Sequence, residues 1–278
     1  MKWNIVADSS CDIFELEGKN ENIEFSTVPF IMNIDNVDYV DDENINVDNL
    51  VDAMYSCKSA SKSACPSPET WLKKFSKEGD VIAITITSAL SGSFNSAVVA
   101  KDMALEKYPD KKIHIIDSLS TGPGLIILIR KLNELISEGL SFEDVVKKIT
   151  EYGKSTHTYF ALSSFDNLVK NGRMHKMAGF VAHRLGLIGV GYGTEKGTIG
   201  IKSIVRGKKK ALNLILNEMK TLGLSSKNVF ITHCQNAELA ESLKQKIEET
   251  WEYVSVTIGN TRGLCSFYAE RHGIIVTF

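Results

Sequence analysis

Runs of apolar, β-branched residues alternate with amphipathic segments along most of the chain, a pattern typical of α/β proteins. Residues 81–87 (VIAITIT) give the clearest strand, because nearly every position is apolar, as in a parallel strand that is buried on both faces. Residues 88–93 (SALSGS) are short and polar and predict a turn, and residues 94–108 predict a helix with one apolar face. We expect this strand, turn and helix to form the centre of the fold.

The same pattern continues in both halves of the chain. In the first half, strands are predicted at residues 3–7, 23–34 and 112–116, and helices at 47–55, 68–75, 125–138 and 141–152. In the second half, strands are predicted at 156–162, 228–232, 253–258 and 273–278, together with a glycine-rich hairpin at 187–205 whose turn lies at 194–197. Helices are predicted at 165–170, up to about 185, at 208–222 and at 237–251. We therefore predict an α/β fold with two lobes. The N-terminal lobe (1–153) has a mostly parallel sheet with flanking helices, and the C-terminal lobe (154–278) has a mixed sheet with helices.

The predicted helix at 125–138 has more apolar residues than one face requires. Ile126 and Ile127 widen the stripe formed by the other leucines and isoleucines of this segment. A second buried face is the commoner explanation, and the wall of an apolar cavity is the alternative. In the next helix, Ser141 and Asp144 have the spacing of a capping box.

Composition and charge exclude several classes of protein. The chain has 278 residues, of which 43% are hydrophobic and 24% charged, and its net charge of −2 provides no basic field for nucleic acid. Its five cysteines are odd in number and lack the Cys-x-x-Cys spacing, which argues against a disulfide framework and a zinc knuckle. The start of the chain has no signal-peptide pattern, and no apolar run is long enough to be an integral membrane segment. We expect a cytoplasmic protein.

Small hydroxyl and acidic residues gather where predicted strands end, which is where open α/β sheets bind ligands. The residues in these positions are Asp8, Ser9, Ser91, Gly92, Ser93, Asp117, Ser118 and, in the second half, His233. Ser63 lies on an adjoining proline-rich loop. Together they predict hydrogen bonds to one small polar head group, with apolar walls holding a tail. For Ser91 and Ser93, a simple helix cap is the alternative.

Catalytic and metal chemistry find less support in the sequence. The segment around Ser91 lacks the leading glycine of a Gly-x-Ser-x-Gly nucleophile elbow, and no histidine is paired with a clear orienting acid. No His-x-x-x-His pattern and no phosphate-binding Gly-x-x-x-x-Gly-Lys-Ser/Thr loop occurs. We predict no catalytic residue, metal or cofactor. An enzyme that uses serine on an acyl or phosphoryl substrate remains the less favoured alternative.

Two groups of basic residues are candidates for docking or phosphate-facing surfaces. One surrounds Gly172 and includes Arg173, and the other follows the predicted hairpin and includes Arg206. Solvated helix ends explain the lysines of both groups. For Arg173, which directly follows a glycine turn, both interpretations stay open: a solvated helix end, and a docking or phosphate-facing residue.

Several segments, taken together, resemble the DegV family of bacterial fatty-acid-binding proteins. They run in the family's order and cover nearly the whole chain, and the most specific is the Leu-Ser-Gly-Ser segment followed by a helix of small residues. The matching segments are IVADSS (5–10), KSACPSP (62–68), ITSALSGSFNSA (86–97), IDS (116–118), LVKNGRM (168–174) and VRGKK (205–209).

The resemblance implies two α/β lobes with a long acyl chain buried between them. It places the fatty-acid carboxylate on hydroxyls of the proline-rich loop and the Ser-Gly turn, which correspond to Ser63 and to Ser91, Gly92 and Ser93. It also implies a carrier that presents the fatty acid to a separate kinase subunit and is not itself the catalyst. Arg173 would then contact the kinase or the acyl phosphate.

The sequence departs from the family pattern at several positions. Ser63 replaces the usual threonine, and Cys65 replaces a common glutamine. An Ile-Lys-Pro segment of the family reads Ile-Gly-Val at 188–190, and the surrounding glycines predict a looser backbone. Ala269 falls near the usual C-terminal histidine, which puts the kinase partnership in question. A DegV-like binder of another amphiphile is therefore a further alternative.

Overall fold

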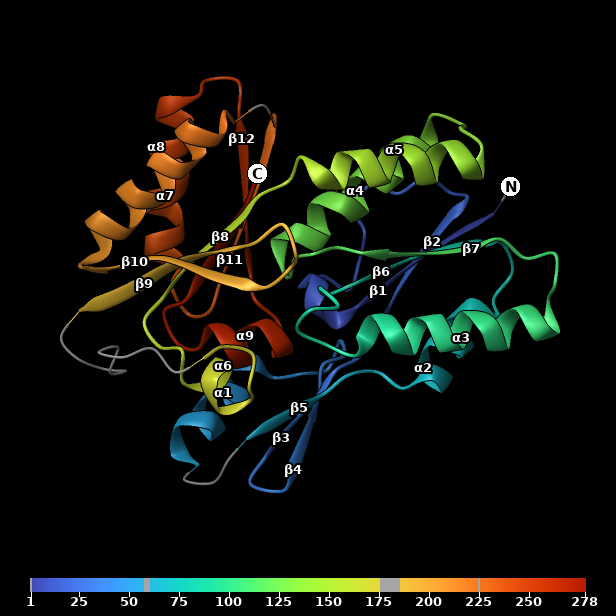
Figure 1. The fold of residues 1–278 in the computed structure, drawn as a ribbon, viewed down its shortest axis with the longest axis horizontal. Helices are drawn as coiled ribbons and strands as arrows, with labels where there is room; N and C mark the ends of the chain where they lie inside the picture. The colour runs from blue at the N-terminus through green and yellow to red at the C-terminus, as the bar shows by residue number, and fades with distance from the viewer. Residues whose placement is uncertain (1, 58–60, 176–185, 225) are drawn as a thin grey trace.

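The computed structural model describes residues 2–57, 61–175, 186–224 and 226–278 and consists of two lobes built on separate sheets (Figure 1). The sheet of the N-terminal lobe has the order β2-β1-β6-β7, and all of its strands are parallel. Its strands are β1 (Trp3–Asp8), β2 (Ile23–Val28), β6 (Asp80–Thr85) and β7 (Ile113–Asp117). Helices cover both faces, as the strands' continuous burial requires. These helices are α2 (Pro68–Phe75) and α3 (Ser93–Lys107) on one face, and α4 (Pro123–Ser137) and α5 (Phe142–Lys154) on the other.

The sheet of the C-terminal lobe is mixed and has the order β10-β9-β8-β13-β11-β12. β11 and β12 are parallel, and the other neighbouring pairs are antiparallel. Its strands are β8 (Thr158–Leu162), β9 (Leu187–Gly193), β10 (Ile199–Arg206), β11 (Asn228–His233), β12 (Ser255–Asn260) and β13 (Ile274–Thr277). Helices α7 (Lys208–Leu222) and α8 (Ala237–Thr250) pack on one face. The other face meets the short helices α6 (Asp166–Lys170) and α9 (Gly263–Ala269).

Pro29 divides the predicted strand at 23–34 between two sheets. β2 ends at Val28, and β3 (Ile31–Ile34) continues in a small antiparallel sheet of order β4-β3-β5. The other strands of this sheet are β4 (Val37–Val40) and β5 (Lys62–Ala64). The small sheet and helix α1 (Val47–Ser56) lie below the two lobes in Figure 1, next to α6 and α9.

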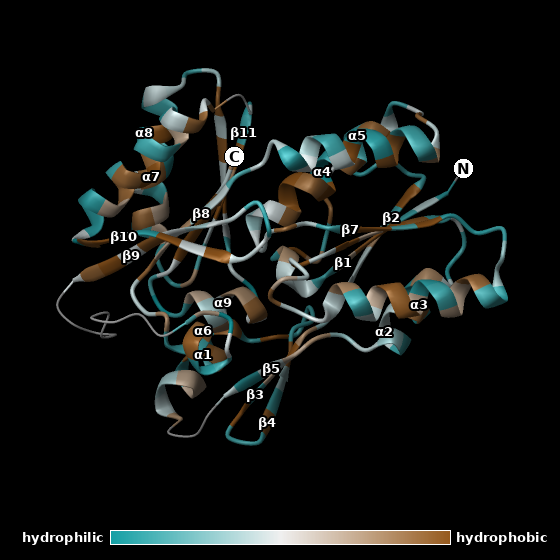
Figure 2. Ribbon diagram, viewed as in Figure 1, coloured by the Kyte–Doolittle hydropathy of each residue, from teal (hydrophilic) through white to brown (hydrophobic). Residues whose placement is uncertain are grey.

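Helix α4 is apolar around most of its circumference and lies between the two large sheets. Ten of its residues are buried, and it is the most continuously hydrophobic helix in the view of Figure 2. It packs on one face of the N-terminal sheet and also contacts β11 and β13 of the C-terminal sheet. The second buried face expected from Ile126 and Ile127 is therefore confirmed.

Several local expectations agree with the structure. Ser141 Oγ accepts a hydrogen bond from the Asp144 amide at 3.2 Å and donates to Asp144 Oδ2 at 2.6 Å, so Ser141 caps the helix as expected. A turn over 194–197 joins β9 to β10, closed by the Gly197 amide donating to the Thr194 carbonyl. The predicted helix that ends near residue 185 lies outside the described residues.

The looser backbone expected around Gly189 is wrong. β9 pairs along its length with β8 and β10, and a register shift occurs only on β10, between Ile201 and Ser203. A Cβ at Gly189 would lie 2.3 Å from the Phe165 ring, and one at Gly191 would lie 2.4 Å from the Phe160 ring. These glycines therefore leave room for the edges of two aromatic rings against the strand.

We propose that the domain boundary lies at residues 153/154. The strands of the parallel sheet all precede this point and those of the six-stranded sheet all follow it. The boundary falls in the last turn of α5.

Candidate functional site

A cavity of about 360 Å³ lies between the lobes, with a volume in the range of small-molecule sites. Its walls come from the loops after β6 and β7 on one side, and from β8, β13 and α9 on the other. Most of the lining side chains are apolar; examples are Phe30, Ile86, Phe160, Leu162, Leu264 and Ile275. Such walls suit an apolar ligand because burial there removes hydrocarbon from water.

One part of the wall, here called the polar end, consists of Ser63, Ser91, Gly92, Arg173 and Tyr268. Ser63 Oγ and the Tyr268 hydroxyl lie 2.7 Å apart. Of the residues that the sequence singled out, Ser63, Ser91, Gly92 and Arg173 are the ones that line the cavity. Four separate chain segments thus converge at the polar end.

The opposite part of the wall, here called the hairpin end, consists of Leu119, Thr158 and Gly193. Thr158 and Leu162 are the first and last residues of β8, so the cavity follows this strand for about 13 Å. The chain continues from Leu162 to α6 and Arg173, which places the polar end beyond the other end of β8. The cavity is therefore elongated, with the Arg173 cation and three hydroxyls at the polar end, whereas the Thr158 hydroxyl at the hairpin end is paired with Ser120 and Thr277.

Asp8 supports the turn at 88–93 from behind. Its carboxylate accepts hydrogen bonds from Ser10 Oγ at 2.5 Å, Ser93 Oγ at 2.7 Å and the Ile86 amide at 2.9 Å. Burial raises the pKa of Asp8 to about 6, against the effect of these hydrogen bonds. Ser93 is fully buried as the first residue of α3, and its hydroxyl is engaged by Asp8. Direct contact of Asp8 or Ser93 with a ligand remains a prediction.

Ser91 acts on the start of α3. Its Oγ accepts a hydrogen bond from the Ser93 amide at 3.2 Å, while Gly92 is the N-cap residue. Ser91 is half-buried, and its hydroxyl keeps a proton to donate. The helix-cap alternative and a place in the cavity wall are thus compatible for this residue.

The remaining candidates lie outside the cavity wall. Ser9 Oγ accepts from the Phe30 amide at 3.0 Å, and Asp117 Oδ1 accepts from the amides of Ser88 at 3.0 Å and Leu119 at 3.1 Å. Ser118 Oγ bonds within its own turn, and His233 Nδ1 accepts from the Asn236 amide before α8. Arg206 is exposed at the end of β10. Their role as ligand contacts remains a prediction.

Arg173 is the residue of the polar end that links the two lobes. Its Nε donates to the Leu90 carbonyl at 2.9 Å, within the turn that precedes α3. The Arg173 amide donates to the Leu168 carbonyl at 2.8 Å, and Gly172 has φ +72°, which ends α6 in a tight turn. The guanidinium is therefore fixed against the serine turn of the other lobe.

Tyr268 is the functional candidate that the sequence analysis missed. It lies on α9, a helix that was not predicted because the segment 263–269 is short. Leu264, Phe267 and Tyr268 have the i, i+3, i+4 spacing of an apolar helix face, and this spacing was the available signal. α9 itself is capped by Asp41, whose carboxylate accepts from the amides of Gly263 and Leu264.

A second buried acid, Asp12, lies at the junction of the lobes. Its Oδ1 accepts from the Arg262 amide at 2.7 Å, whereas neither its Oδ2 nor the buried Thr232 hydroxyl has a hydrogen bond of ordinary geometry among the described residues. Both atoms approach Gly122, so they face the same space. Burial raises the pKa of Asp12 to about 7.

Asp12 should make stability depend on pH. Its folded pKa lies above the ordinary 3.8, so the folded protein keeps a proton that the unfolded chain releases, and stability falls as pH rises from about 4 to 7. Asp12→Asn cannot ionise and offers an amide to Thr232. We expect the fall in unfolding free energy between pH 5 and pH 8 to be smaller in this variant by about 1–2 kcal/mol. Urea titrations at both pH values measure it, and parallel curves for the two proteins would contradict the assignment.

Taken together, the fold and the cavity define a two-lobed α/β protein that encloses an elongated apolar site with a polar end. The family model described as "Uncharacterised protein, DegV family" matches residues 2–275, and the chain belongs to the DegV family. A DegV domain-containing protein of Streptococcus pyogenes serotype M18 is 41% identical over 278 residues, covering 100% of this chain and 99% of the relative.

Solved structures of similar proteins contain fatty acids. The Fatty Acid Kinase (Fak) B3 protein of Streptococcus pneumoniae, loaded with linoleic acid, has a TM-score of 0.97 and 41% identity, covering 100% of this chain and 99% of that one. A DegV family protein of Eubacterium eligens, loaded with heptadecanoic acid, has a TM-score of 0.95 and 34% identity, covering 99% and 98%. The predicted family and the α/β fold with one mostly parallel and one mixed sheet are thus confirmed.

Among the described residues, none of the helices combines the length and the hydropathy needed to cross a membrane.

Proposed function

We propose that this protein binds a long-chain fatty acid in the cavity, with the carboxylate at the polar end and the acyl chain toward the hairpin end. The observation that carries the proposal is the shape of the site, an elongated apolar cavity with Ser63, Ser91 and Tyr268 hydroxyls grouped at one end. Relatives that share the whole fold contain linoleic and heptadecanoic acid, which supports the same ligand class here.

Each part of the site would contribute a different share of affinity. Burial of the acyl chain contributes at most about 0.8 kcal/mol per methylene, so chain length dominates the binding free energy. Hydroxyl donors at the carboxylate add about 1.5–3 kcal/mol each. The positive end of the α3 dipole lies behind Ser91 and Gly92 and favours an anion at this place.

We further propose a carrier role in the cytoplasm, in which a separate kinase subunit phosphorylates the bound carboxylate and this chain is not the catalyst. The support is the similarity to a protein named for a fatty acid kinase. Arg173 is part of the polar end, where it would meet a kinase or an acyl phosphate. Ala269 lines the cavity near the family's usual histidine position, and the neighbouring Tyr268 supplies a hydroxyl there instead.

The first test is to ask whether the purified protein carries lipid. Organic extraction followed by mass spectrometry is expected to find long-chain fatty acids. If neither lipid nor saturable binding of long-chain acids is found, the proposal fails. Recovery of a different amphiphile would favour the alternative of a binder with another ligand.

The head-group assignment is tested by Ser63→Ala. Loss of this hydroxyl should weaken stearic acid binding about tenfold, or about 1.4 kcal/mol, because a hydrogen bond to a charged group is lost. Stearyl alcohol should be affected less, since its neutral head group forms a weaker bond. Fluorescence displacement titrations give both constants, with Ser67→Ala on the same loop, at the α2 cap, as the matched control. Equal losses for the acid and the alcohol would count against the assignment.

A further inference from the structure

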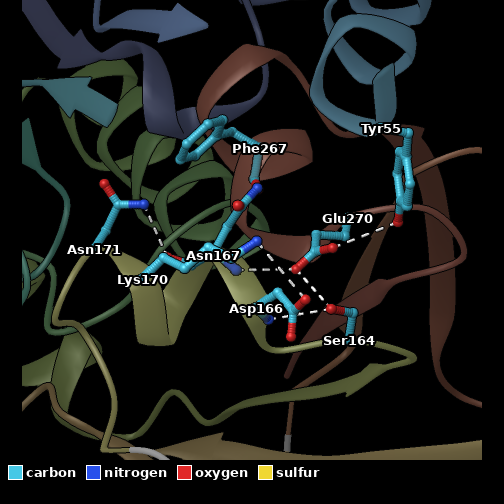
Figure 3. Close-up of polar contacts among 8 residues, drawn as sticks. All are labelled: Tyr55, Ser164, Asp166, Asn167, Lys170, Asn171, Phe267 and Glu270. Atoms are coloured by element: carbon cyan, nitrogen blue, oxygen red, sulfur yellow. Dashed lines mark hydrogen bonds and ion pairs between the residues drawn. The ribbon is translucent and has the colours of Figure 1, made fainter. Parts of the chain in front are cut away.

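A buried acid outside the cavity wall joins three chain segments (Figure 3). Glu270 follows α9 and is 5% exposed. Its Oε1 accepts hydrogen bonds from Ser164 Oγ at 2.8 Å and from the Asn167 amide at 3.1 Å. On its other side, the Tyr55 hydroxyl of α1 donates to Oε2 at 3.5 Å.

These contacts connect the segments that supply the polar end. Asn167 belongs to α6 and also donates from Nδ2 to the Phe267 carbonyl of α9 at 2.8 Å, so two bonds tie α6 to α9. Arg173 follows α6 after one turn, and Tyr268 precedes Glu270 by two residues. The Glu270 carboxylate thus sets the distance between the segment carrying the guanidinium and the segment carrying the phenol.

The cost of this arrangement argues that it does more than fill space. Burial raises the pKa of Glu270, which reflects the loss of solvation of its carboxylate. Its backbone has φ +56°, a conformation that is costly for a residue with a side chain. An apolar residue would remove the cost of burying the carboxylate, and a glycine would remove both costs, so the acceptor itself has a task. Glu270 does not line the cavity, so that task is not direct contact with a ligand.

We infer that Glu270 is a positioning residue, which holds the Arg173 turn and Tyr268 in the relative placement needed to receive a ligand carboxylate. This inference rests on the proposed function, because it assumes that an acid binds at the polar end. It predicts a specific defect, in which recognition of the head group suffers and the apolar part of the site does not. General loosening of the fold would instead weaken every ligand of the cavity.

The experiment compares stearic acid with stearyl alcohol on one set of variants. Glu270→Met has a similar volume but no strong acceptor, and we expect it to weaken stearic acid binding about tenfold and stearyl alcohol binding less than threefold. Glu270→Gln keeps a carbonyl oxygen for Ser164 and Asn167 and should stay within about threefold of the wild type for both ligands.

Two further variants make the comparison decisive. Glu218 on α7 is a matched control, because it also accepts from a tyrosine hydroxyl, that of Tyr159 at 3.0 Å, and it lies away from the polar end. Glu218→Met should leave the ratio of the two affinities unchanged. Ser164→Ala removes one donor to Glu270 and should shift the ratio in the same direction as Glu270→Met by a smaller factor, which covers the case in which Glu270→Met fails to fold.

The outcomes separate this inference from the proposed function. If wild-type protein binds no stearic acid, the proposed function fails first. If the wild type binds and the folded Glu270 or Ser164 variants lose both ligands equally, or lose neither, the positioning role is overturned while the proposed function stands.

Discussion

Replacement of Gly193 by phenylalanine is expected to weaken stearic acid binding about 100-fold, while decanoic acid is nearly unaffected. A Cβ at Gly193 would lie 3.7 Å from the Leu119 carbonyl oxygen and 4.0 Å from Thr158 Cβ, which are ordinary contacts, and φ at this position is not positive. The ring would occupy the hairpin end and displace about four methylenes, a loss of about 3 kcal/mol. Titrations with a series of saturated acids from ten to eighteen carbons would show the change in preferred chain length.

Gly193→Ala is the control for this change, because a methyl group fits the same space without reaching far into the cavity. It should bind all chain lengths within a few-fold of the wild type. If Gly193→Phe weakened short and long chains by the same factor, the acyl chain would not run toward the hairpin end, and the orientation proposed above would be wrong.

Asp8→Ala is expected to lower the free energy of unfolding by about 3–5 kcal/mol at pH 7. The change leaves the buried hydroxyls of Ser10 and Ser93 and the Ile86 amide without their acceptor, and each unsatisfied buried donor costs about 1–3 kcal/mol. Some of this cost is recovered, because ionised Asp8 is itself penalised by burial. Urea unfolding followed by tryptophan fluorescence measures the difference.

Asp117→Ala provides the comparison, since Asp117 also ends a strand of the parallel sheet and accepts from two amides but is only half-buried. Its replacement should cost about 1 kcal/mol, because water can reach the donors that it leaves. A similar small loss in both variants would show that the donors around Asp8 find other partners, and that the turn at 88–93 does not depend on this carboxylate.

Local patterns predicted the parts of the fold that depend on local physics. The strand at 81–87 and the helix at 94–108 appear as β6 and α3 with ends shifted by at most two residues. The helix cap at Ser141 and the turn over 194–197 could be predicted equally well, because their hydrogen bonds join residues close in sequence. Elements that depend on distant partners were missed. β5 has three residues and forms only because it pairs with β3. The first amide of α9 donates to the carboxylate of Asp41, more than 200 residues away in sequence.

The residues of the candidate site likewise divide into those that local patterns could predict and those that depend on contacts with distant segments. Ser63 and Ser91 could be proposed because hydroxyls after strands suggest a ligand, and the family resemblance named the same positions. The sequence could not distinguish Ser91, which lines the cavity, from Ser93, which points to Asp8, because that depends on which side of the turn each hydroxyl faces. Tyr268 and Glu270 were missed because both act through contacts with segments about 100 to 215 residues away.

The position of α4 limits how a ligand can enter. Because this helix belongs to the core of the N-terminal lobe and also packs against β11 and β13 of the other lobe, the lobes cannot swing apart about a linker without exposing apolar residues of α4. We therefore expect a ligand to enter through smaller movements of the cavity's rim, such as separation of the Arg173 side chain from the Leu90 carbonyl. Under the proposed function, α4 would keep the interior around the ligand intact, and a few surface contacts such as this one would set the rate of its exchange.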